Sequence, residues 1–90
     1  MPKADYQIEG YRIFWHSNDH APEHFHIEYR GHWEIRIYFV ESMKDDFLHF
    51  DIVWPKTRLN LTGRELRLFQ EYVISHQEHL LREWETKVCT

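Results

Sequence analysis

Four stretches of the chain alternate apolar and polar residues with the two-residue period of a half-buried β-strand. We therefore predict strands over Tyr11–His16, His24–Tyr29, Trp33–Val40 and Phe47–Trp54. Three polar segments separate them. Ser17–Pro22 has the composition of a loop, Arg30–His32 contains the glycine of a tight hairpin turn, and Glu41–Asp46 is predicted to be a polar turn.

The last third of the chain has the pattern of one long amphipathic helix. Thr62 and Glu65 have the spacing of a capping box, in which each side chain binds the other residue's backbone N–H. The predicted helix extends from Gly63 to Lys87, and its apolar stripe consists of Leu66, Phe69, Val73, Leu80, Leu81, Trp84 and Val88. Gln77 lies near the centre of this stripe, so we expect it to be hydrogen-bonded or to lie at a subunit contact.

These elements predict an α+β fold: a four-stranded, mainly antiparallel sheet with one long C-terminal helix packed on one face. Residues 1–90 form a single domain in this interpretation, with a lead-in over 1–9, the sheet over 10–54 and the helix over 63–87. The apolar face of each strand then packs against the helix. In the fourth strand that face consists of Leu48, Phe50, Ile52 and Trp54.

The opposite sheet face collects polar side chains from all four strands. They are Arg12, His16, His24, His26, Glu28, Glu34, Arg36, Tyr38, His49 and Asp51. A solvated strand face is expected to be polar, but four histidines with arginine and tyrosine are an unusual choice for one. The simplest interpretation is structural, because histidine fills half-exposed strand positions and a bare sheet face is often covered by a second copy of the chain.

A metal site is a second interpretation of this face. His24 and His26 are two residues apart in a strand and therefore project to the same side. Zinc binds mixed sets of histidine and carboxylate ligands. His16, His20 or Glu28 would complete a tetrahedral set around a zinc ion.

Metal-independent RNA cleavage is a third interpretation. This chemistry needs a general base, a general acid and a cation that stabilises the phosphorane. His24 or His26 would exchange protons together with Glu28. Arg36 would hold the phosphate, and Tyr38 would stack or donate a hydrogen bond.

Composition narrows the classes of partner. A net charge of −4 with neutral histidines argues against binding nucleic acid mainly by phosphate neutralisation. The only cysteine, Cys89, leaves no intramolecular disulfide to form, which fits a reducing compartment. There is no signal-peptide pattern and no apolar run of about 18 residues. We therefore predict a cytoplasmic location without a membrane span.

One segment resembles a known family. The string Asp-His-x-Pro-x-His-Phe-His begins at Asp19 and ends at His26, and the predicted helix ends with a spaced set of His76, Leu80, Trp84 and Glu85. Together these residues resemble the small bacterial proteins of the domain of unknown function 4160 family, over roughly Tyr11–Glu85. Two segments depart from the family pattern: Glu23 replaces a second proline, and Leu59–Gly63 replaces a Gly-x-Leu-Pro approach to the helix.

The resemblance implies partners in two-gene operons that are similar to toxin–antitoxin pairs or mobile-element cargo, and it implies no reaction. Our leading hypothesis is a homo-oligomeric interaction module that engages a small protein from a neighbouring gene. An endoribonuclease-like toxin is the alternative, with catalytic residues His24, His26, Glu28 and Arg36. A zinc-binding domain that uses His24 and His26 is the third hypothesis. Further binding residues are expected at His20, Pro22, Tyr38, His49 and Asp51.

Overall fold

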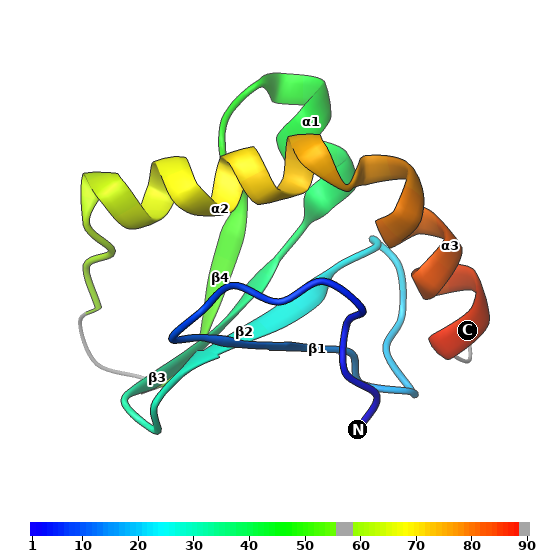
Figure 1. Cartoon of the computed structure of the whole chain (residues 1–90), viewed down its shortest axis with the longest axis horizontal. Helices are drawn as coiled ribbons and strands as arrows, with labels where there is room; N and C mark the ends of the chain where they lie inside the picture. The colour runs from blue at the N-terminus through cyan, green and yellow to red at the C-terminus, as the bar shows by residue number, and fades with distance from the viewer. Residues whose placement is uncertain (56–58, 89–90) are drawn as a thin grey trace.

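The computed structural model describes residues 1–55 and 59–88, which form one sheet and three helices. The strands β1 (Arg12–Phe14), β2 (Phe25–Tyr29), β3 (Trp33–Ile37) and β4 (Phe50–Trp54) lie in the order β1-β2-β3-β4, each antiparallel to its neighbour. The helices are α1 (Phe39–Asp45), α2 (Gly63–Ser75) and α3 (Gln77–Lys87). Helix α2 crosses the sheet, as Figure 1 shows. The predicted α+β class and four-stranded antiparallel sheet are confirmed.

One face of the sheet and all three helices share a single apolar core. A row of isoleucines crosses the four strands in register: Ile13, Ile27, Ile35 and Ile52. Trp15 follows β1 and is fully buried (0 % exposed). Its ring centroid lies 5.9 to 6.2 Å from the rings of Phe25, Phe39 and Trp84. Trp15 therefore joins the sheet to α1 and to α3.

The predicted inward position of Trp54 is wrong. The pairing of β3 with β4 skips one residue, because Ile35 lies opposite Ile52 while Glu34 lies opposite Trp54. Such a bulge re-aims the side chains that follow it. The Trp54 indole consequently reaches the polar face, where its Nε1–H donates to Glu34 Oε1 at 3.2 Å.

The predicted polar turn over Glu41–Asp46 is wrong, because a short helix occupies this segment. Strand β3 ends at Ile37, and α1 begins at Phe39. Phe39 and Ser42, three residues apart, are both buried, which is helical spacing. Ser42 Oγ accepts the His49 N–H and donates to the Tyr38 carbonyl, each at 2.8 Å. The hydroxyl thus forms hydrogen bonds with backbone groups before and after α1. The polar composition of the segment gives no sign of this helix.

The predicted single helix is two helices. Its start is confirmed, because the Thr62–Glu65 capping box is present with N–H···O distances of 3.0 and 3.1 Å. The break falls at His76, whose backbone dihedrals (φ −121°, ψ 20°) leave the helical range. Gln77 is exposed at the start of α3, so its expected place at the centre of an apolar stripe is also wrong.

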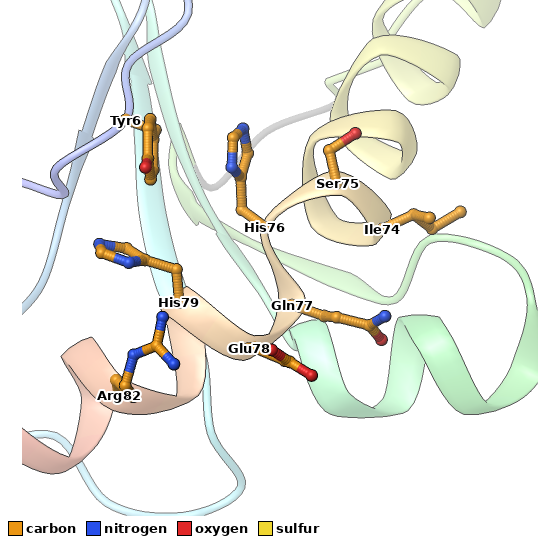
Figure 2. A pocket seen from close by; sticks show the side chains of 8 residues that line it. All are labelled: Tyr6, Ile74, Ser75, His76, Gln77, Glu78, His79 and Arg82. Atoms are coloured by element: carbon orange, nitrogen blue, oxygen red, sulfur yellow. The ribbon is translucent and has the colours of Figure 1, made fainter.

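Tertiary contacts account for the break at His76. Its ring stacks on Tyr6 at 4.4 Å between centroids, and Figure 2 shows these rings facing each other beside His79. The Tyr72 hydroxyl donates to the Tyr6 carbonyl at 2.7 Å. Because α3 changes direction here, Leu80 and Trp84 reach the core cluster, and tertiary packing overrides the helical pattern.

Residues 1–9, the predicted lead-in, run along the free edge of the sheet at β1. Lys3 pairs with Phe14 in an isolated antiparallel bridge, so the segment covers the free edge of β1. Glu83 of α3 is only 3 % exposed and accepts from the Asp5 N–H, the Trp15 indole and Lys87 Nζ. The first residues and the last helix are thus joined by one buried carboxylate.

The Tyr11 hydroxyl predicts a loss of stability at alkaline pH. It donates to Glu65 Oε2 at 2.8 Å, and burial, followed by this hydrogen bond, raises the pKa of Tyr11 from 10.0 to about 12. The unfolded chain releases this proton first, so the contribution is complete below pH 10 and is lost as the pH rises toward 12. Urea unfolding at about pH 8 and about pH 11 should therefore show a smaller loss for Tyr11→Phe than for the parent protein. An equal loss in both proteins would contradict this assignment.

Some sequence-based expectations fall beyond the described residues. Residues 56–58, between the predicted fourth strand and the predicted helix, lie outside the described part of the chain, and so does Cys89. In residues 1–55 and 59–88, no helix combines the length and the apolar character that a membrane crossing requires.

Candidate functional site

The centre of the polar sheet face is buried, contrary to the predicted solvated surface. His24, immediately before β2, is 5 % exposed, and His26 within β2 is 3 % exposed. Phe14 of β1 is fully buried and stacks on the His26 ring, with centroids 5.3 Å apart. The histidine pair is therefore buried within the domain and is not part of an open surface.

The loop between β1 and β2 supplies a carboxylate to this pair. The Asp19 N–H donates to the His16 carbonyl at 3.2 Å, which forms a turn that brings the Asp19 side chain back over the sheet. Asp19 Oδ2 lies 3.0 Å from His24 Nε2 and 2.9 Å from His26 Nε2. One carboxylate oxygen thus meets a ring nitrogen from each histidine.

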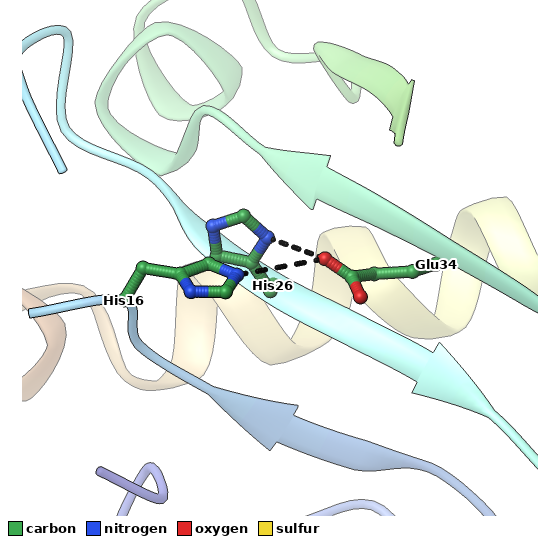
Figure 3. A group of neighbouring side chains, drawn as sticks. All are labelled: His16, His26 and Glu34. Atoms are coloured by element: carbon green, nitrogen blue, oxygen red, sulfur yellow. Dashed lines mark hydrogen bonds and ion pairs between the residues drawn. The ribbon is translucent and has the colours of Figure 1, made fainter. Parts of the chain in front are cut away.

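A second carboxylate lies on the other side of His26. Glu34 Oε2, from β3, is 3.0 Å from His26 Nδ1 and 3.7 Å from His16 Nε2, and Figure 3 shows both rings directed at this oxygen. The Trp54 indole occupies the other oxygen of Glu34. Glu34 is itself buried, so its orientation is set by these partners.

The two histidines are oriented through their Nδ1 atoms. His24 Nδ1 lies 2.8 Å from the Pro22 carbonyl, which only accepts, so this nitrogen carries the hydrogen. Burial lowers the pKa of His26, and the hydrogen bond with Asp19 acts in the opposite direction. With Nδ1 of His24 directed at Pro22 and Nδ1 of His26 directed at Glu34, the Nε2 atom of each ring points at Asp19.

A cavity of about 550 Å³ opens beside the site. It is lined by Met1, His16, Ser17, Asn18, Asp19, His26, Arg36 and Val53. Arg36 of β3 lies opposite His26 in the sheet register. Its Nε is buried without a hydrogen-bond partner, and none of the described carboxylates lies within ion-pair distance of its guanidinium.

The other predicted site residues have partners of their own or are exposed. Glu28 pairs with Arg12 at 3.3 Å instead of joining the histidines. The Tyr38 hydroxyl donates to Asp51 at 2.7 Å, and burial, followed by this bond, raises the pKa of Tyr38. His49 contacts Asp45 of α1 at 2.8 Å, while His20 and Pro22 are exposed. The proposed catalytic set therefore divides: His26 and Arg36 line one cavity, His24 contacts Asp19 beside it, and Glu28 is engaged elsewhere.

Two residues of the candidate site, Asp19 and Glu34, were not among the catalytic, binding or metal-ligating residues predicted from the sequence. Asp19 takes the place expected of His16, His20 or Glu28 beside the two histidines. Its sequence signals are its place at the start of the family motif and its position five residues before His24 in a proline-containing loop. Glu34 belonged to the polar face by alternation, but only the sheet register reveals that it stands behind His26.

Comparison with known proteins identifies a family and adds no chemistry. The model of a family described as "Domain of unknown function (DUF4160)" matches residues 10–85. This match confirms the family resemblance of the sequence. No curated protein and no solved structure gave a match.

Proposed function

The chain belongs to the family described as domain of unknown function DUF4160, and we propose that it binds one divalent transition-metal ion between Asp19, His24 and His26. The observation that carries this proposal is the convergence of three electron-pair donors. Their ligand atoms, Asp19 Oδ2 and the two Nε2 atoms, all lie within 4.8 Å of one another.

Hydrogen counting at His24 supports a Lewis acid in this position. A neutral imidazole carries one hydrogen, and at His24 that hydrogen is directed to the Pro22 carbonyl. The Nε2 lone pair then faces Asp19 Oδ2 at 3.0 Å, and a carboxylate oxygen has no hydrogen to share. A cation coordinated by both atoms, in place of a second imidazole hydrogen, would make this contact favourable.

His26 has the surroundings of a metal ligand on both ring nitrogens. Metal-binding histidines usually donate their second N–H to a carboxylate or a backbone carbonyl, which fixes the ring and raises its basicity. Glu34 stands in that position for His26, and Pro22 stands there for His24. In the neutral form, a hydrogen on His26 Nδ1 leaves Nε2 to coordinate.

The ligand types and spacing indicate the class of metal. Two imidazoles and one carboxylate suit zinc and its neighbours in the first transition row. Ligand atoms about 2.1 Å from one ion are about 3.0 Å apart at a right angle and about 3.4 Å apart at the tetrahedral angle. The observed N···O spacings of 2.9 and 3.0 Å are close to the first value. Three protein ligands leave at least one coordination position for water or another ligand.

A zinc titration tests the proposal. At free zinc about 100 times the dissociation constant, linkage adds about 2.7 kcal/mol to the free energy of unfolding. For a domain of this size, that corresponds to a rise in Tm of about 10–20 °C by calorimetry or circular dichroism. Magnesium at the same concentration should leave Tm unchanged, because it prefers oxygen ligands. An unchanged Tm with zinc, cobalt and nickel would refute a metal-binding function.

The interaction module suggested by the family resemblance stays a separate prediction. Of the residues in its motif, His20 and Pro22 are the exposed ones and are available to a partner. His24 and His26 are buried and are better suited to a ligand inside the domain.

A further inference from the structure

We infer that the cavity beside Asp19 and His26 binds an oxyanion of the phosphate class, held jointly by the bound metal and by Arg36. This inference rests on the metal-binding function proposed above. It assigns to the site a ligand that coordinates the open metal position. Arg36 supports it through its positive charge, its unpaired Nε and its place in the lining of the cavity.

One donor of Arg36, its Nε, has no partner inside the described residues, while the guanidinium lies close enough to the Tyr38 hydroxyl to act against the rise in the pKa of Tyr38. Its Nε is buried and unpaired, and its guanidinium forms no ion pair there. The nearest carboxylate by register is Asp51, directly opposite on β4, yet Asp51 accepts from the Tyr38 hydroxyl instead. A partly buried guanidinium without a counter-ion is unfavourable unless an anion completes its hydrogen bonds.

The cavity places this cation beside the proposed ion. Arg36, Asp19 and His26 line the same space, and Arg36 neighbours His26 across the sheet. A phosphate group has enough oxygens to occupy a metal position and to accept from a guanidinium fork at the same time. Ser17 and Asn18 also line the cavity and offer further hydrogen-bond donors. The volume of about 550 Å³ is in the range of small-ligand sites.

Charge makes oxyanion binding depend on the metal. Without an ion, the Asp19 carboxylate faces the cavity and repels an anion. A divalent cation reverses the local charge, so metal and oxyanion should strengthen each other's binding by reciprocal linkage. The sheet offers a matched control, because Arg12 is a second arginine whose Nε is occupied by Glu28.

The test uses cobalt(II) as the metal and inorganic phosphate as the probe. Cobalt is titrated first and followed by its visible absorption bands. Phosphate is then added to the loaded and to the metal-free protein, with binding followed by the bands and by calorimetry. We expect phosphate to shift the bands and to bind the loaded protein at least about tenfold more tightly than the metal-free protein.

Variants separate this inference from the proposed function. Arg36→Gln should weaken phosphate binding about tenfold or more while leaving the cobalt isotherm unchanged, and Arg12→Gln should alter neither. Arg36→Lys keeps the positive charge but loses the paired N–H donors of the guanidinium, so its phosphate affinity should lie between those of the parent and of Arg36→Gln. If no cobalt bands appear, the metal-binding function fails. If cobalt binds but phosphate leaves the bands unchanged, strips the ion, or binds the parent and Arg36→Gln alike, the oxyanion site is refuted while the metal site stands.

Discussion

Replacing Trp15 with alanine should remove about 3–5 kcal/mol from the free energy of unfolding, the range seen when a fully buried aromatic residue is truncated. The ring contacts three other aromatic residues from β2, α1 and α3, so its loss opens a cavity where these elements meet. Its indole also donates to the buried Glu83 carboxylate at 3.3 Å. Small domains have only about 5–15 kcal/mol in total. Urea unfolding followed by circular dichroism should therefore show a midpoint well below that of the parent protein.

Phe47 provides the control for this truncation. It is 59 % exposed, and its ring stacks on His49 at the surface. Phe47→Ala should therefore change the unfolding free energy by about 0.5 kcal/mol or less. Equal losses for the two variants would show that the core does not depend on Trp15.

Asp19→Asn should abolish the rise in Tm that zinc produces, a difference of about 10–20 °C at saturating metal. The amide keeps the size of the side chain but removes the charge that joins the two Nε2 atoms. The metal-free Tm of each protein serves as its own baseline, because the substitution also changes the contacts of this side chain with His24 and His26. Calorimetry with and without zinc measures both quantities.

Two further variants test whether the loss of zinc binding depends on distance from the proposed site. Glu34→Gln weakens the support behind His26 and should lower zinc affinity about 10–100-fold without abolishing binding. His49→Gln removes a histidine that also contacts an aspartate, at α1, and should leave zinc binding unchanged. If His49→Gln matches Asp19→Asn, zinc is bound by surface histidines and not at the proposed site.

Local patterns predicted the parts of the fold that depend on one element at a time. Alternation identified all four strands, and the spacing of Thr62 and Glu65 identified the start of α2, because these signals are contained in a few neighbouring residues. Strand pairing followed from the short connection through Arg30–His32. The core isoleucines follow from the same alternation.

The errors occur where distant residues decide the outcome. Trp54 lies on the polar face because β4 carries an extra residue opposite β3, and the sequence of β4 alone contains no sign of it. The helix breaks at His76 because Tyr6, 70 positions earlier in the chain, stacks there. Helix α1 was missed since its charged outer face resembles a turn.

The candidate site shows the same division. His24 and His26 were found through their spacing within one strand. Asp19 reaches them only through the return of a loop, and Glu34 only through the register with β3. Burial of the pair was unforeseen, because it depends on how that loop covers the sheet.

The buried Glu83 carboxylate has a consequence for the cooperativity of this small domain. It joins Asp5 and Lys87, and Lys87 Nζ also binds the Lys3 carbonyl across 84 positions of the chain. Fraying of either end would leave a charge stranded against the apolar core, which is costly in a low-dielectric interior. The segment around Asp5 and the end of α3 are therefore both held to the apolar core through this carboxylate. Amide exchange in α3 should then follow unfolding of the whole domain rather than local opening.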